Sequence, residues 1–417
     1  MLLLTILVLC LLTAINYQFG GRAVLHPAVV FSAVWAIALS LLAASGDMFY
    51  PMLPETLAIF LFGAFAFSAG CWIAMLPVAS PYLPSPVLRS SSNRIIWGLL
   101  VVVAIGAPFY YRWLSGLIAG SGKEGPFLML VRMSTVELMG KSSAFTIFGT
   151  LADLSRIVAM MAFWESERHP KRSVFAIVIA LFMSGVTGQK SGPFLLVVAL
   201  ICIDWLKRRR VRWKLIGVMF LIMLATATAV EFYVHVGGGS FSDNIGAVFR
   251  LFVLYGSGGL VGFDQVIRQP HIVPQFNPVH VIWLRIIRKF GANVDIPEVA
   301  DFISIGPNSL QDNVYTMYWS YLDIGYAGMM AVTAATGFIV TFVYRRALGK
   351  GPLWVFLYAS LLYAVAFSIF TEFFVSTIYF LFKVCAVSWL VYSLPVKWAQ
   401  FRRFTEESVE ADLAKAG

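Results

Sequence analysis

Residues 27–44 read PAVVFSAVWAIALSLLAA, a run of eighteen residues without a charged side chain. About 20 predominantly apolar residues cross the hydrocarbon core of a bilayer as an α-helix. The whole chain shares this character, since 59% of its 417 residues are hydrophobic and 12% are charged. A soluble domain carries about twice that charged fraction. The sequence therefore predicts an all-α polytopic membrane protein.

Ten further segments resemble residues 27–44, so about eleven transmembrane helices are expected. The predicted spans cover residues 2–17, 27–44, 57–76, 95–115, 144–164, 173–187, 192–206, 215–234, 326–344, 353–369 and 373–394. These spans leave little room for a separate soluble domain. We expect one integral membrane domain over residues 1–396 and a short cytoplasmic tail over residues 397–417.

Lysine and arginine residues are concentrated in alternate connections between the spans, as at Arg168–Arg172 and Lys207–Lys214. Cytoplasmic loops carry such an excess, which places the N-terminus outside and the C-terminus in the cytoplasm. The formal net charge of +10 then reflects orientation and contact with membrane lipids, and it does not indicate a nucleic-acid partner. The one large loop, residues 235–324 between the eighth and ninth spans, faces the outside.

Residues 245–267 in this loop are apolar enough to resemble a twelfth span. The stretch carries Arg250 and the cluster Gly256–Gly259, which is predicted to be a turn, since no Walker sequence follows it. Making this stretch a span would also move Arg345 and Arg346 to the outside, against the positive-inside rule. We therefore expect interfacial helices in the loop, lying on the membrane or packed across the bundle.

The spans at residues 173–187 and 192–206 are about 15 residues long, or about 22 Å at 1.5 Å per residue. A hydrocarbon core is about 30 Å thick, so their connection is expected to lie below the outer membrane surface. Irregular backbone at that depth lines a cavity or is buried in protein. On this hypothesis Lys190 binds a substrate phosphate in an outward vestibule. The alternative is that Lys190 snorkels to lipid headgroups.

Arg285 and Arg288 are three residues apart, so on a helix their guanidinium groups share a face. Two such groups suit the paired oxygens of a diphosphate. Arg250, embedded in an apolar run, is a further candidate diphosphate ligand, because a lone arginine there is expensive without a partner. The alternative for the Arg285–Arg288 pair is an interfacial helix whose basic side rests on anionic lipid headgroups.

Three residues are candidates for catalytic acid–base work: His280, Asp323 and Glu372. His280 precedes Arg285 by five residues, and the two carboxylates lie at the outer ends of apolar helices. Each carboxylate has the alternative of pairing with an arginine. Histidine spacing suggests no metal site, and no DxD or Walker motif is present, so no cofactor is expected.

The stretch Asn313–Gly328 resembles the bacterial Wzy-type oligosaccharide repeat-unit polymerases. These enzymes show Asn-x-Tyr-Thr, an aromatic run, and then Asp-x-Gly-x-x-Gly entering a helix. The matching positions here are Asn313, Tyr315, Thr316, Asp323, Gly325 and Gly328. The turn Thr187–Ser191 is similar to the family's Thr-Gly-x-Arg-Ser, with Lys190 where arginine is more usual.

The resemblance implies a GT-C-like glycosyltransferase of the bacterial inner membrane, with a periplasmic N-terminus and a periplasmic 235–324 loop. Such a metal-independent enzyme transfers a glycan from undecaprenyl diphosphate to the terminal sugar of an incoming lipid-linked unit, building O-antigen or exopolysaccharide. A polysaccharide chain-length regulator is a further expected partner. Substrate binding would fall to Asn313, Tyr315, Thr316 and Trp319, although this aromatic run is also typical of an interfacial belt.

Two alternatives remain open. An O-antigen ligase would use the same donor but transfer to lipid A core, with a histidine-centred signature in the late loop. A non-enzymatic transporter or flippase of lipid-linked oligosaccharide would favour internal repeats and many charges along the spans. No repeat is found, and the charges inside the spans are few, among them Asp153, Arg156, Glu231 and Lys383.

Overall fold

The computed structural model describes residues 1–76, 91–121, 131, 143–186, 191–214, 216–218, 221, 241–269, 277–292, 294, 302–307, 310–349 and 351–393. Within these ranges the chain is helical apart from connections and one short two-stranded hairpin. Six of the described helices are long and apolar enough to cross a membrane. The prediction of a helical polytopic membrane protein is therefore confirmed, while the number of spans stays a prediction.

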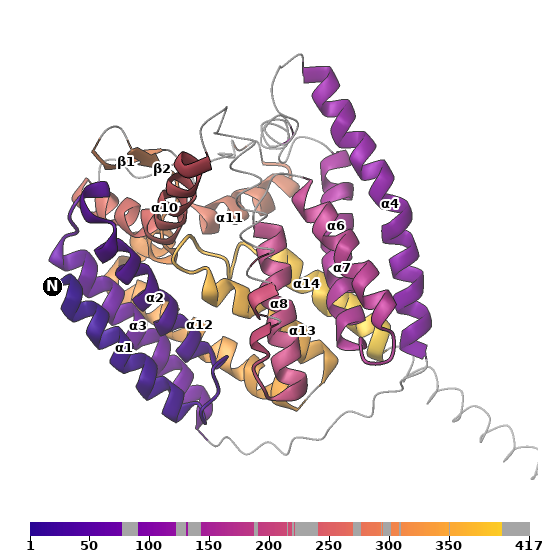
Figure 1. The fold of residues 1–417 in the computed structure, drawn as a ribbon, viewed down its shortest axis with the longest axis horizontal. Helices are drawn as coiled ribbons and strands as arrows, with labels where there is room; N and C mark the ends of the chain where they lie inside the picture. The colour runs from indigo at the N-terminus through magenta and orange to yellow at the C-terminus, as the bar shows by residue number, and fades with distance from the viewer. Residues whose placement is uncertain are drawn as a thin grey trace, which may run out of the picture.

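One side of the molecule is a tightly packed helical group (Figure 1). Its members are α1 (Leu2–Phe19), α2 (Pro27–Ala44), α3 (Pro54–Met75) and α12 (Gly325–Leu348). A side chain at Gly70 of α3 would come within 1.9 Å of the carbonyl oxygen of Ala334, and one at Gly337 within 2.2 Å of that of Phe67. Small residues thus let the backbones of α3 and α12 touch, as is common between membrane helices.

The other side and the middle of the molecule hold the remaining helices of the bundle (Figure 1). They are α4 (Ser91–Ser121), α6 (Ser143–Trp164), α7 (Pro170–Gly185), α8 (Ser191–Arg208), α13 (Pro352–Ala366) and α14 (Ile378–Ser388), which continues as the π-helical turn η3 (Trp389–Ser393). Helix α13 contacts both α8 and α12, so it joins the two sides.

The 235–324 segment covers one end of this bundle (Figure 1). Its described elements are α10 (Phe241–Arg268), α11 (Pro278–Lys289), β1 (Ile303–Gly306), β2 (Leu310–Asp312) and the 3-10 helix η2 (Met317–Ile324). The strands are antiparallel and pair Ile303 with Asp312. The short 3-10 helix η1 (Gly46–Met48) lies at the same end, where the amide of Tyr50 donates to the carbonyl of Ile305 at 3.0 Å. We call this the hairpin end.

The opposite end of the bundle gathers arginine and lysine side chains that cap helix C-termini, and we call it the basic end. Arg345 donates to the carbonyl of Ala74 at 2.6 Å, and Arg209 to that of Leu348 at 2.8 Å. Lys207 donates to the carbonyl of Trp164 at 2.8 Å. Such contacts suit the partial negative charge of a helix C-terminus. Which end faces the periplasm stays a prediction.

Ten of the eleven predicted spans coincide with a described helix. The exception, residues 215–234, lies almost wholly outside the described residues, as does the 397–417 tail. The predicted span 353–369 ends earlier, at Ala366, because residues 367–377 form a largely half-buried series of turns. The tight turn expected around Glu372 is therefore a longer connection folded into the protein.

The turn predicted at Gly256–Gly259 is wrong, because α10 runs through it without a break. The glycines instead allow close packing. A side chain at Gly259 would meet the carbonyl oxygen of Ile369 at 2.8 Å, and one at Gly262 that of Val314 at 2.6 Å. Of the two positions expected for this helix, the structure has it packed across the end of the bundle.

Candidate functional site

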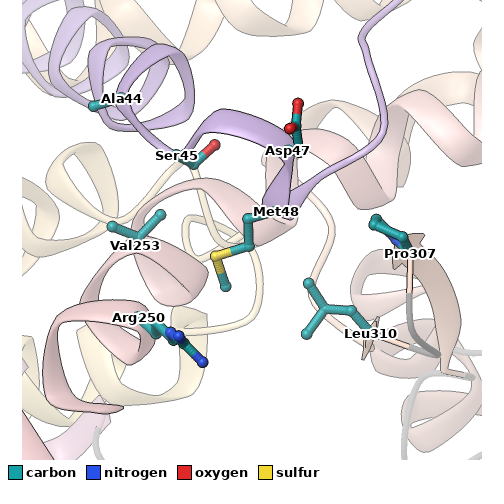
Figure 2. A pocket seen from close by; sticks show the side chains of 8 residues that line it. All are labelled: Ala44, Ser45, Asp47, Met48, Arg250, Val253, Pro307 and Leu310. Carbon is teal, nitrogen blue, oxygen red and sulfur yellow. The ribbon is translucent and has the colours of Figure 1, made fainter. Parts of the chain in front are cut away.

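A cavity of about 530 Å³ opens at the hairpin end, and Arg250 lines it (Figure 2). Arg250 and Val253 come from α10, while Pro307 and Leu310 come from the hairpin. The connection after α2 forms the remaining wall with Ala44, Ser45, Asp47 and Met48. This volume lies in the range of small-molecule sites. The cavity combines one exposed cation with one carboxylate on an otherwise mostly apolar wall.

Asp264 fixes α10, and with it Arg250, at this end of the bundle. Its buried carboxylate accepts hydrogen bonds from the amide of Leu53 at 2.8 Å and the hydroxyl of Thr56 at 2.6 Å. Arg268, one turn later on α10, donates to the second oxygen at 2.7 Å. A buried carboxylate at the N-terminus of α3 is stabilised by the free backbone amides there. The position of the Arg250 cavity thus depends on a saturated ion pair.

Helix α11 confirms that Arg285 and Arg288 lie on a helix, which begins after Asn277. The Asn277 side chain accepts from the amide of Val279 at 3.0 Å and donates to the carbonyl of Ser320 at 3.2 Å. Arg288 is exposed, whereas the side chain of Arg285 lies outside the described residues. Among the α11 residues whose side chains the structure describes, none lines the Arg250 cavity. The pair therefore stays a prediction as a diphosphate ligand.

The outer face of α11 carries His280, Trp283, Ile287 and Phe290, all of them exposed. Trp283 is 60% exposed and Phe290 87% exposed. These residues recur every three or four positions and so occupy one side of the helix. An apolar, aromatic face with an arginine beside it is typical of a helix lying on a membrane surface.

The stretch that carries the family resemblance is folded into the core. Tyr315 is 1% exposed and Trp319 is 4% exposed, and their rings lie 4.9 Å apart. Thr316 is also buried, while Asn313 is half-buried. The hydroxyl of Thr316 and the indole nitrogen of Trp319 have no hydrogen-bond partner within the described part of the chain. In this arrangement the rings contact protein on both sides, so their role in substrate binding stays a prediction.

Glu372 is completely buried in the 367–377 connection. One oxygen accepts from the amide of Phe374 at 2.7 Å, and the other from that of Ser376 at 3.1 Å. The amide of Val375 and the hydroxyl of Tyr321 also donate to this carboxylate. Burial raises the pKa of Glu372, and these hydrogen bonds act in the opposite direction. The Glu372 oxygens thus accept hydrogen bonds from their own turn and from Tyr321 of η2. Asp323, near the end of η2, is exposed instead.

Lys190 lies outside the described residues, so its proposed depth is not tested. Sequence reasoning treated Asp153, Arg156 and Lys383 only as scattered charges, whereas the structure brings the three together between α6 and α14. The available signal was the presence of ionisable groups inside predicted spans, which is unusual in membrane proteins. Their pairing could not be read from the sequence, because 230 positions separate Asp153 from Lys383.

Among the described residues, no cluster of three or more histidine, cysteine or carboxylate side chains is placed to hold a metal ion. Comparison with known proteins adds no family: no family model, no curated protein and no solved structure matches this chain.

Proposed function

We propose that this protein joins lipid-linked oligosaccharide repeat units at the periplasmic face of the bacterial inner membrane. It would transfer a growing glycan from undecaprenyl diphosphate to the terminal sugar of an incoming lipid-linked unit. One observation carries the proposal. The cavity lined by Arg250 adjoins β2, whose last residue, Asp312, directly precedes the stretch Asn313–Gly328 that resembles the polymerases.

The chemistry requires charge stabilisation and a base. A hydroxyl oxygen of the acceptor sugar attacks the anomeric carbon of the donor, and the bond from that carbon to the diphosphate breaks. The diphosphate leaves with the bonding electron pair, and a guanidinium such as that of Arg250 stabilises its developing charge. The hydroxyl proton passes to a base, for which Asp323, His280 and Glu372 are the candidates.

Of these candidates, Asp323 and His280 are exposed at the hairpin end and can meet a substrate hydroxyl. The oxygens of Glu372 are engaged by backbone amides and by Tyr321, which favours a role in holding η2 in position. A general base must come within hydrogen-bonding distance of the proton that it removes. The proposal therefore ranks the two exposed residues ahead of Glu372.

Gene deletion followed by analysis of the surface glycan tests this function. Loss of a polymerase leaves single repeat units on the acceptor. A ligase deletion leaves no units attached, and loss of a transporter accumulates precursor on the cytoplasmic side. Either of the last two results would overturn the proposal.

Complementation with Arg250→Ala tests the site itself. We expect a fall of about a hundredfold in polymerisation, as for loss of one charge-stabilising donor, with unchanged protein level. Arg94→Ala removes an equally exposed arginine from the start of α4 and should leave polymerisation intact. Chains of normal length in the Arg250→Ala strain would exclude Arg250 from the reaction.

A further inference from the structure

Three ionisable side chains, all partly exposed, meet between α6 and α14. Asp153 and Arg156 lie near the middle of α6, one turn apart, and Lys383 projects from α14. The ammonium of Lys383 is 2.5 Å from one oxygen of Asp153 and 3.3 Å from the hydroxyl of Thr150. Arg156 donates to the other oxygen of Asp153. We call Asp153, Arg156 and Lys383 the α6–α14 cluster.

Within the described part of the chain, the charges of this cluster do not balance. Two cations share one carboxylate, and the Nε atom of Arg156 is buried without a hydrogen-bond partner in the described ranges. A cation inside an apolar helix bundle is costly and normally finds a partner. Asp264 and Arg268 match one cation to one carboxylate. Asp204 also pairs with two cations, but Arg208 and Arg212 are 40% and 44% exposed, and exposed charges need no further partner. The α6–α14 cluster therefore has capacity for one further negative group.

The surroundings of Arg156 leave its guanidinium accessible and oriented. Its central carbon lies 5.4 Å from the ring centre of Phe380, one turn before Lys383 on α14. A side chain at Gly192, in the first turn of α8, would come within 3.0 Å of a guanidinium nitrogen. The side chain of Arg156 is 17% exposed, and that of Lys383 is 33% exposed. Both cations can therefore be reached by a ligand.

The cluster lies beside the start of α8, which faces the hairpin end of the bundle. Helix α8 begins beside Arg156, and its other end reaches the basic end through Lys207. Phe194, in the first turn of α8, contacts Phe367 at the start of the 367–377 connection, with 5.6 Å between ring centres. The start of α8 beside the cluster thus faces the same end of the molecule as the Arg250 cavity.

We propose that the α6–α14 cluster binds a phosphate-class oxyanion, the phosphate or diphosphate headgroup of an isoprenoid lipid. The planar fork of Arg156 suits two phosphate oxygens, and the ammonium of Lys383 adds a point charge. Asp153 lies between the two cations and accepts a hydrogen bond from each. This inference deepens the proposed function, because it names a second contact for the same lipid substrate. Binding, however, can be measured without turnover.

Affinity measurements on the purified full-length protein in detergent test the proposal. The probes are farnesyl diphosphate, representing a lipid headgroup, and inorganic diphosphate, representing a free anion. We expect farnesyl diphosphate to bind, and Arg156→Gln or Lys383→Gln to weaken it by about tenfold or more. Asp153→Asn should tighten it, because removal of the carboxylate leaves both cations available to the ligand. The matched control Arg112→Gln, an exposed cation on α4, should change nothing.

The two probes distinguish the sources of the oxyanion. If equal concentrations of inorganic diphosphate displace farnesyl diphosphate, the site binds a free anion and the lipid assignment is wrong. If inorganic diphosphate binds much more weakly than farnesyl diphosphate, the site recognises the lipid. Equal affinities for farnesyl diphosphate in the parent, Arg156→Gln and Lys383→Gln proteins would overturn the proposal. Thermal unfolding of each variant shows that it is folded. If the purified parent protein binds farnesyl diphosphate but the deletion strain still makes full-length glycan chains, the polymerase function is wrong and the lipid site stands.

Discussion

The carboxylates of Asp264 and Asp153 each pair with cations of the helical bundle, and the two arrangements differ. At the hairpin end, Asp264 pairs with one cation, Arg268. Its carboxylate also accepts hydrogen bonds from Leu53 and Thr56 at the start of α3. In the α6–α14 cluster, Asp153 faces both Arg156 and Lys383. The first arrangement is balanced and saturated, whereas the second carries one surplus positive charge.

The difference separates structural charges from ligand-binding charges. Breaking a balanced buried pair strands a charge without a partner and destabilises the fold. Removing a surplus charge relieves a cost that the folded protein bears until a ligand arrives. Stability measurements on variants of the two arrangements should therefore give opposite signs. The acid prediction for His26 tests separately whether an unpaired buried charge is costly.

The largest effect is expected for Asp264→Ala. This change leaves Arg268 and the amide of Leu53 without their acceptor, at a cost of about 3–5 kcal/mol in the free energy of unfolding. Denaturant titration of the protein in detergent measures this loss. Glu167→Ala is the control, because the Glu167 side chain is 60% exposed and an exposed pair contributes less than about 1 kcal/mol. If the two variants are equally stable, Asp264 does not hold the fold together as proposed.

An intermediate effect is expected from acid, through His26 beside the packed α2–α12 interface. The His26 ring is 1% exposed and lies 5.2 Å from that of Tyr344, and burial lowers its pKa from 6.5 to about 4. Between these values the unfolded chain binds a proton that the folded protein excludes. Stability should fall as pH drops through this window, by about 1.4 kcal/mol per pH unit.

Unfolding free energies measured between pH 7 and pH 4.5 test this titration. His26→Phe should flatten the profile in that range, whereas His169→Gln should keep the slope. A parent protein that is equally stable at both ends of the range would show that an unpaired buried charge is tolerated at His26.

The smallest effect is expected for Lys383→Met. This variant leaves Asp153 and Arg156 as a balanced pair and replaces a partly buried ammonium with an apolar side chain of similar length. The free energy of unfolding should change by less than about 1 kcal/mol or rise, as read from the same denaturant titration. A loss of unfolding free energy as large as that of Asp264→Ala would show that Lys383 is a structural residue and would argue against a ligand-binding role.

The membrane helices were predictable, since an apolar run such as residues 27–44 must satisfy its backbone internally wherever it lies in a bilayer. Helix ends were less predictable: α13 begins at Pro352, beside the start of the predicted span 353–369, but it ends early, at Ala366, because of contacts of the next turn. The carbonyl of Ser368 there accepts from the amide of Met317, and its hydroxyl from the indole of Trp35 at 3.1 Å. The turn predicted at Gly256–Gly259 was wrong, because glycine is favoured both in turns and where helices pack closely.

For the candidate site, the sequence singled out Arg250 as a costly charge in an apolar run, and the structure has it lining a cavity. It could not show that Tyr315 and Trp319 are buried, because an aromatic run is equally compatible with a core and with a binding surface. The exposure of Asp323 and the engagement of Glu372 likewise depend on neighbours that lie far away in the chain.

By itself, then, the sequence determined that this protein is a bundle of apolar helices, because hydrophobicity and helix length are properties of one continuous segment. Only the tertiary structure decided which charges meet: Lys383 reaches Asp153 across 230 positions, and Asp264 reaches Leu53 across 211. Such contacts depend on helix order and on the close approach that glycines permit. Helix order and close packing therefore decide whether a charged side chain finds all its partners within the protein or can still bind a ligand.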